Sequence, residues 1–133
     1  MKEKYLELFE MACEARTRAY VPYSGYSVGA ALLCKNGKIF LGCNIENSAF
    51  TPTSCAERTA IFKAVSECER EFEAIAVVAG KDKLEPPSPC GVCRQVMLEF
   101  CDDNFEVILG TCVEDLYVTT LGDLIPNSFR TYK

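Results

Sequence analysis

The sequence predicts an α/β fold, in the form of a three-layer α/β/α sandwich around a mixed five-stranded sheet. Three observations support this fold class. Apolar residues recur at helical spacing near the N-terminus, short apolar runs bounded by turn residues follow, and through the middle of the chain such runs alternate with helical segments. Alternating strands and helices place helices on both faces of a sheet. The 133 residues are enough for one domain with one core, spanning residues 1–133.

The first part of the chain predicts a helix followed by a hairpin. A helix is expected over residues 2–18 because apolar residues repeat there with helical spacing, and Pro22 forces the chain out of it. Residues 28–34 form a short apolar run, and Asn36-Gly37 is typical of a tight hairpin turn. Residues 39–44 are therefore expected to return as the second strand.

Helices and strands alternate through the rest of the chain. A loop with three prolines separates the third strand from the following helix, and Pro126 ends the last helix. The predicted element order is αββαβαββα. The expected elements after the hairpin are helices over residues 55–66, 90–100 and 121–125, and strands over residues 74–79, 105–110 and 116–120.

Composition narrows the function classes. The chain carries 14 Lys and Arg against 19 Asp and Glu, a formal net charge of −5, and no basic cluster. DNA or RNA is therefore disfavoured as a partner, whereas a small neutral substrate fits this charge. No apolar run approaches the length that spans a membrane, so no membrane partner is expected. The first five residues lack the apolar block of a signal peptide, and a cytoplasmic location is expected.

Nine cysteines and the absence of histidine limit the available chemistry. An odd number of cysteines in a reducing compartment argues against a disulfide framework. Without histidine, neither histidine metal ligands nor a Ser-His-Asp or Cys-His arrangement is possible. Three cysteines form a motif of their own. The other six are expected to be small buried hydrophobic residues: Cys13, Cys34, Cys43, Cys68, Cys101 and Cys112.

That motif predicts a catalytic zinc site. Cys55 lies at one predicted helix start, and Cys90 and Cys93 lie one turn apart at another. Three thiolates hold Zn²⁺ and leave the fourth position open for water, and helix N-termini stabilise the thiolates. Glu57, two residues after Cys55, is placed to move the protons of that water. Arg58 adds a positive charge that can support the thiolates as an outer partner or simply face solvent.

Three other interpretations of these residues stay open. A Cys-x-x-Cys at a helix start is also typical of a thioredoxin-like redox pair. Ser54 and Glu57 also fit a capping box, with Ser54 as N-cap. A structural zinc module would use the same cysteines with a fourth protein ligand, which Cys101 or Cys112 can in principle supply.

Several motifs together resemble the small homotetrameric cytidine deaminases, one branch of the zinc nucleoside and nucleotide deaminases. The resemblance covers nearly the whole chain. The matching motifs are Pro22-Tyr23-Ser24, Val28-Gly29-Ala30-Ala31-Leu32, Gly42-Cys43-Asn44-Ile45-Glu46-Asn47, Cys55-Ala56-Glu57-Arg58-Thr59-Ala60, and Ser88-Pro89-Cys90-Gly91-Val92-Cys93-Arg94-Gln95-Val96.

The resemblance implies a role for several more residues. Asn44 and Glu46 match a ribose-binding pair, and Tyr26 matches an aromatic that packs on the pyrimidine. The backbone of Ala56 matches a contact to the base carbonyl, and Phe129 matches an aromatic that enters a neighbouring subunit's site. The implied function is zinc-dependent hydrolysis of cytidine and 2′-deoxycytidine to the uridines and ammonia, in pyrimidine salvage, by a homotetramer whose sites are completed across subunits.

Two positions depart from the pattern. Many relatives have Phe where this chain has Tyr26, and others have Tyr where it has Phe50. The hydroxyl of Tyr26 needs a partner if it is buried, whereas Phe50 lacks a hydroxyl near the sugar end. A nucleotide or a blasticidin-type compound is the nearer rival substrate, and Glu46 disfavours a phosphate placed near it.

Overall fold

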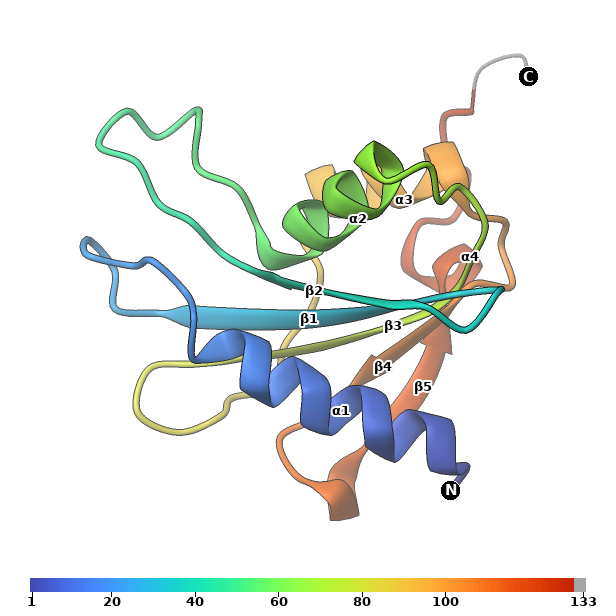
Figure 1. The fold of residues 1–133 in the computed structure, drawn as a ribbon, viewed down its shortest axis with the longest axis horizontal. Coiled ribbons are helices and arrows are strands. Elements are labelled where there is room, and N and C mark those ends of the chain that lie inside the picture. The colour runs from blue at the N-terminus through green and yellow to red at the C-terminus, as the bar shows by residue number, and fades with distance from the viewer. Residues whose placement is uncertain (131–133) are drawn as a thin grey trace.

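The computed structural model describes residues 1–130 and has the predicted order of helices and strands (Figure 1). One short 3₁₀ helix, η1, was not predicted. The elements are α1 (Glu3–Arg16), β1 (Ser27–Cys34), β2 (Ile39–Cys43), α2 (Ala56–Ser66), β3 (Phe72–Gly80), α3 (Gly91–Phe100), β4 (Glu106–Leu109), η1 (Val113–Asp115), β5 (Tyr117–Thr120) and α4 (Leu121–Leu124).

The five strands form one mixed sheet in the order β2-β1-β3-β4-β5. Strand β1 pairs antiparallel with both β2 and β3, β3 pairs parallel with β4, and β4 pairs antiparallel with β5. Helix α3 supplies the crossover that a parallel pair needs. The predicted mixed sheet is therefore confirmed.

Helices cover both faces of the sheet. Figure 1 shows α1 on one side and α2, α3 and α4 on the other. Side chains along a strand alternate between the faces, so Ile75 and Val77 of β3 join the core beneath α2 and α3, while Ala76 and Val78 join the core beneath α1. The predicted three-layer sandwich is confirmed.

Two glycines let helices approach the sheet closely. A Cβ atom on Gly29 of β1 would lie 2.1 Å from the carbonyl oxygen of Ala12 in α1. A Cβ atom on Gly42 of β2 would lie 2.3 Å from the carbonyl oxygen of Ala56, in the first turn of α2. Only glycine fits such contacts, and Gly42 thereby sets the position of the start of α2.

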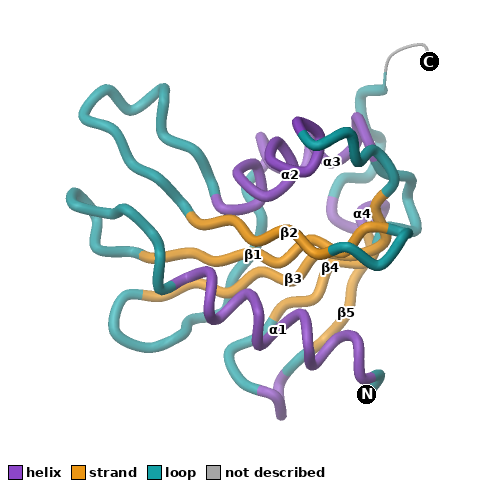
Figure 2. Tube along the Cα trace, in the orientation of Figure 1, coloured by secondary structure: helices purple, strands orange, loops and turns teal. Residues whose placement is uncertain are grey.

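Long loops meet at one end of the sheet. The loops that follow α1 and β2 extend past the same end in Figures 1 and 2, and isolated bridges join Tyr20 to Ile45 and Ile45 to Ser54. The loop after β3 is tied back by a bridge between Ala79 and Glu85. Because loops positioned by a rigid scaffold commonly carry function, a functional site is expected at this end of the sheet.

The expectation for the six remaining cysteines is only partly right. Cys34 and Cys101 are buried, and Cys13 and Cys43 are half-buried. Cys68 and Cys112 are exposed, because they lie in turns after α2 and β4 and do not face the core.

Across residues 1–130, the structure contains no helix that is both long and apolar enough to cross a membrane.

Candidate active site

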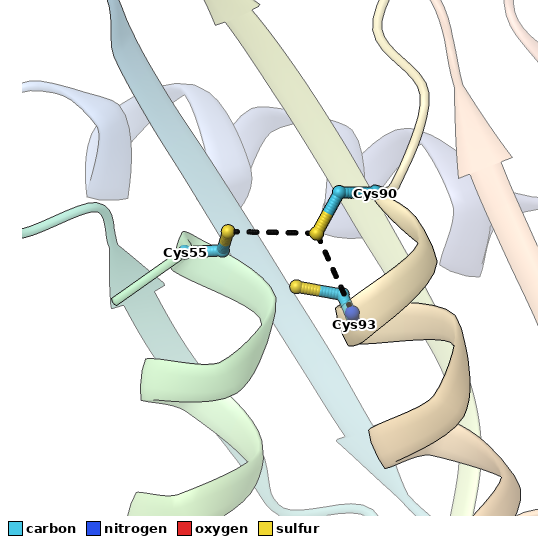
Figure 3. A group of neighbouring side chains, drawn as sticks. All are labelled: Cys55, Cys90 and Cys93. Atoms are coloured by element: carbon cyan, nitrogen blue, oxygen red, sulfur yellow. Dashed lines mark hydrogen bonds between the residues drawn. The ribbon is translucent and has the colours of Figure 1, made fainter. Parts of the chain in front are cut away.

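The three motif cysteines converge from two helix starts. Cys55 is the N-cap of α2 and Cys90 is the N-cap of α3. The Sγ atoms of Cys55 and Cys90 lie 3.7 Å apart, and the backbone N–H of Cys93 donates to Cys90 Sγ at 3.4 Å (Figure 3). The prediction that both segments fall at helix starts is confirmed, so both helix dipoles favour thiolates at this point.

The geometry fits a zinc ion. The three Sγ atoms all lie within 4.8 Å of one another. Thiolates held about 2.3 Å from a tetrahedral zinc ion lie about 3.8 Å apart, close to the distance between the Cys55 and Cys90 sulfur atoms. Figure 3 shows the three side chains directed toward a common point.

Among the described residues, no fourth His, Cys, Asp or Glu completes this group. Cys101 is buried at the C-terminal end of α3, and Cys112 is exposed before η1. The structural zinc module with either cysteine as fourth ligand is therefore not supported. The redox-pair interpretation also loses ground, because Cys55 brings a third sulfur to the Cys90-Cys93 pair.

Arg58 lies beside the thiols. Its Nη2 donates to Cys55 Sγ at 3.2 Å, while its Nε is buried without a hydrogen-bond partner in the described structure. Hydrogen bonds from Cys93 and Arg58 lower the pKa of Cys55 to about 5, although burial opposes that shift. The Cys55 thiolate in turn raises the pKa of Arg58. Arg58 thus adds positive charge where the sulfur atoms carry negative charge.

Glu57 is the only buried charged residue in the described part of the chain, with 4% of its surface exposed. Burial raises the pKa of its carboxyl to about 7, although its own backbone N–H lowers it. The capping box predicted as an alternative is wrong. Cys55 rather than Ser54 is the N-cap, and no side chain caps this helix end. The Ser54 hydroxyl is instead 3.3 Å from both Cys55 O and Thr59 Oγ1, so it does not accept a bond from a backbone N–H in the first turn of the helix.

A cavity of about 170 Å³ opens beside the thiols. Glu57, Tyr26 and Asn44 line it together with Cys55 and Cys90. The sequence did not identify the rest of its wall, although Ser88 directly precedes the second cysteine motif. Those further lining residues are Val28, Thr53, Ser54, Val77, Ala79, Pro87 and Ser88.

Asn44 and Glu46 make hydrogen bonds that order the neighbouring loops. Asn44 Oδ1 accepts from the Val28 N–H and its Nδ2 donates to Tyr26 O, both at 2.9 Å. Glu46 Oε2 accepts from the Ser24 hydroxyl at 2.5 Å, and Oε1 accepts from the Ser24 and Tyr23 N–H groups. These bonds, first that from the hydroxyl, lower the pKa of Glu46. Asn44 lines the cavity, whereas Glu46 faces the loop of residues 23–24.

The remaining predicted residues are not among those that line the cavity. Ala56 is fully buried as the first residue of α2, where backbone N–H groups have no partner within the helix. Phe129 belongs to a different hollow beside α3, and 71% of its surface is exposed. Phe50 is 84% exposed in the loop before α2. Within one chain, Phe129 is therefore not brought to the thiols.

A family model describes most of the chain. Residues 2–109 match the cytidine and deoxycytidylate deaminase zinc-binding region. The match contains all three converging cysteines and Glu57, and ends at the last residue of β4.

Individual proteins are also similar over nearly their full lengths. A cytidine deaminase of Sporosarcina psychrophila is 55% identical over 87% of this chain and 84% of its own. The crystal structure of cytidine deaminase from Burkholderia pseudomallei superposes with a TM-score of 0.86 at 46% identity, covering 97% of this chain and all of that chain. A blasticidin-S deaminase of Bacillus cereus is 34% identical over 95% of this chain and 92% of its own.

Proposed function

The chain belongs to the cytidine and deoxycytidylate deaminase family, and on that premise we propose that it hydrolyses cytidine and 2′-deoxycytidine to the corresponding uridines and ammonia. One observation carries the proposal most directly. The three thiol sulfur atoms converge within 4.8 Å of one another, and two of these cysteines, Cys55 and Cys90, line a cavity whose wall also contains the buried Glu57.

Cys55, Cys90 and Cys93 are the residues that would hold the zinc ion of this family. When bound, zinc supplies a water molecule acidified toward neutral pH, which is a nucleophile for C4 of the pyrimidine. Two helix N-termini and Arg58 offset the negative charge of the three thiolates. Such a site keeps one position free of protein ligands, as a catalytic zinc site requires.

Glu57 is proposed to carry the protons of the reaction. It takes a proton from the attacking water and delivers it to ring N3. It then takes the proton of the new C4 hydroxyl and gives it to the departing amine, so that a carbonyl forms at C4 as the C–N bond breaks and ammonia leaves. A carboxyl with a pKa near 7 both accepts and donates protons efficiently at neutral pH, and burial raises the pKa of Glu57 to about that value.

The loops beside the cavity are proposed to bind the nucleoside. Tyr26 and Asn44 line the cavity, where an aromatic ring suits the pyrimidine and an amide suits sugar hydroxyls. The ordered carboxylate of Glu46 retains acceptor sites for a ribose hydroxyl, and its charge disfavours a 5′-phosphate. The N–H of Ala56, in the first turn of α2, is proposed to donate a hydrogen bond to the carbonyl of the base.

A homotetramer is proposed to complete each site. The exposed ring of Phe129 lies away from its own cavity, while Gln95 Nε2 holds its backbone carbonyl at 3.0 Å. This arrangement supports the insertion of Phe129 into the site of a neighbouring copy. We further propose that the enzyme acts in the cytoplasm, in pyrimidine salvage.

A panel of substrates tests the activity. Cytidine, 2′-deoxycytidine, 2′-deoxycytidine monophosphate and blasticidin S would be offered to the zinc-loaded protein, and loss of the 4-amino group followed by ultraviolet absorbance. Turnover of both nucleosides at rates well above the other two is expected. Faster turnover of blasticidin S would favour the activity named for the Bacillus cereus relative, and no turnover of any compound would contradict the proposal.

A further inference from the structure

Arg94 makes a three-way contact that joins the Cys90 loop to the last helix. Its Nε donates to the carbonyl oxygen of Pro89 at 2.7 Å, and its Nη2 donates to the hydroxyl of Ser88 at 2.7 Å. Its Nη1 donates to the carbonyl oxygen of Leu124, in α4, at 2.5 Å. Three different groups on two separate segments are thus held by one guanidinium.

The contact lies directly behind a predicted metal ligand. Pro89 immediately precedes Cys90, and the backbone N–H of Arg94 also donates to Cys90 O at 3.0 Å, in the first turn of α3. The Arg94 guanidinium therefore fixes the two residues before Cys90, while the backbone N–H of the same residue holds the Cys90 carbonyl in an ordinary helical bond. This limits rotation of the backbone that aims the Cys90 side chain.

Cys90 depends on its backbone more than the other two cysteines do. Cys93 is buried inside α3, and Cys55 is held by a hydrogen bond from Arg58. Cys90 is exposed, and the hydrogen bonds of its sulfur, with Cys55 Sγ and the Cys93 N–H, join it to the other two cysteines. A loop with three prolines leads into it. Holding this loop in place before the metal binds reduces the ordering cost of binding.

Charge alone does not explain the contact. All three acceptors of Arg94 are neutral, and within residues 1–130 no ion pair joins Arg94 to a carboxylate. The planar guanidinium is suited to several acceptors at fixed angles, whereas a lysine ammonium cannot reproduce that fork. Leu124 O is one of the carbonyls that a short helix leaves without an internal partner, so Arg94 also completes the end of α4.

We propose that Arg94 is a positioning residue that sets how tightly the site retains zinc, by locking the Ser88-Pro89-Cys90 segment onto α4. The inference rests on the zinc site and not on the identity of the nucleoside. Outer contacts that orient metal ligands typically change metal affinity by about 10- to 100-fold when they are removed. Arg94→Lys keeps the charge and removes the fork, so it isolates the geometry.

The test measures zinc release from the purified zinc-loaded protein to a chromogenic chelator. Arg94→Lys is expected to release zinc at least about tenfold faster than the unmodified protein. The matched control is Arg70→Lys, because Arg70 also donates to the carbonyl of a helix end, Val65 O at 2.9 Å, but lies away from the Cys90 loop. It is expected to release zinc at the unmodified rate.

A purely structural role predicts a different pattern. The thermal midpoint of the zinc-free protein would then fall in Arg94→Lys while zinc release stayed unchanged, and that result would overturn the inference. If Arg94→Lys does not fold, Ser88→Ala removes only one of the three acceptors and is expected to speed release by a smaller factor. Release from a folded Ser88→Ala variant at the unmodified rate would equally overturn it. Because zinc release needs no substrate, a failed deamination assay would leave this test intact.

Discussion

At the scale of single residues, Glu57 combines features that are costly in a fold and useful in a reaction. Glu57 is only 4% exposed and forms no ion pair within residues 1–130, and burial of this kind destabilises the ionised form of a carboxyl. Burial accordingly raises its pKa to about 7. Perturbed carboxyls beside metal-binding thiols are typical of catalytic sites.

Glu57→Gln is predicted to abolish proton transfer while preserving the site. The amide has nearly the same size but cannot accept the water proton, so the turnover rate for cytidine should fall by roughly 10²- to 10⁴-fold. Zinc content, measured by metal analysis of the same sample, should stay unchanged because Glu57 is not one of the three sulfur ligands. Retained turnover at full zinc content would remove Glu57 from the catalytic role.

The sequence predicted the residues of the metal site better than their local geometry. Spacing placed Cys55, Cys90 and Cys93 at helix starts, and the structure brings them together. The pattern Ser-x-x-Glu suggested Ser54 as N-cap. In the structure the N-cap is Cys55, one residue later. A one-residue shift cannot be resolved from propensity alone, but here it decides whether Glu57 caps the helix or faces the cavity.

At the scale of elements, the position of α2 depends on its contact with β2. A Cβ atom at Gly42 would strike Ala56 O and Ala60 N, so a larger residue must displace the turn that carries Cys55 and Glu57. Gly29 makes an equivalent approach to α1 on the opposite face of the sheet. Substituting each glycine in turn therefore distinguishes a loss of fold stability, expected for both, from a displacement of the cysteine site, expected for Gly42 alone.

Gly42→Ala is predicted to weaken both the fold and the site. Overpacking of this kind costs about 1–3 kcal/mol or more in the free energy of unfolding. Gly29→Ala should carry a similar cost in urea unfolding, but only Gly42→Ala should also accelerate zinc release. Equal zinc release from both variants, at equal stability, would show that the start of α2 is not positioned by Gly42.

The contact of α1 with the sheet should make stability depend on acid pH. The Tyr5 hydroxyl donates to Glu106 Oε2 at 2.5 Å, and Lys4 Nζ lies 3.0 Å from Glu106 Oε1. Burial raises the pKa of Glu106, but these two partners outweigh it and hold that pKa below the ordinary value of 4.5. The native state then binds fewer protons than the unfolded chain, so this stabilisation is present above that value and is lost as pH falls through the folded-state pKa.

Glu106→Gln is predicted to flatten the acid side of the stability curve. Urea unfolding of the unmodified protein between pH about 5 and 3 should show a steeper fall in the free energy of unfolding than unfolding of the variant. Glu10→Gln, a change at an exposed position of α1, should keep the steeper fall. Parallel curves for all three proteins would exclude Glu106 as a source of acid sensitivity.

Sheet order was harder to predict than element order. Periodicity located all five strands, but the position of β1 between β2 and β3 is set by long-range pairing that no local window contains. The short helix η1 was missed for a different reason. Side-chain bonds of Asp115 to Thr111 and to the Cys112 N–H form that turn without any apolar pattern.

At the scale of the whole molecule, one chain supplies the metal site, whereas Phe129 remains outside it. The resemblance to homotetrameric deaminases predicted that this aromatic side chain enters the site of a neighbouring subunit. Within one chain, Gln95 of α3 donates to the Phe129 carbonyl, and the Arg130 guanidinium donates to carbonyls at the end of the same helix, so the backbone on both sides of the exposed ring is held against α3. No local sequence signal distinguishes such a residue from an ordinary tail aromatic.

Phe129→Ala is predicted to weaken substrate binding without loss of zinc. Light scattering of the unmodified protein should give four times the chain mass of 14.8 kDa. Loss of one aromatic contact should raise the KM for cytidine by roughly three- to tenfold. Tyr117→Ala, at an exposed aromatic on β5, serves as control and should leave KM unchanged. An unchanged KM in a tetrameric Phe129→Ala protein would place this residue outside the site.

The central claim, that three thiols hold one zinc ion whose presence is required for deamination, is tested most directly by titrating the zinc-free protein with zinc while cytidine turnover is followed. Turnover should rise in proportion to added zinc and level off at one ion per chain. Cys112→Ala, which removes an exposed thiol, should behave identically, whereas Cys90→Ala should neither retain zinc nor turn over cytidine. Full turnover by zinc-free protein, or by Cys90→Ala, would contradict the account.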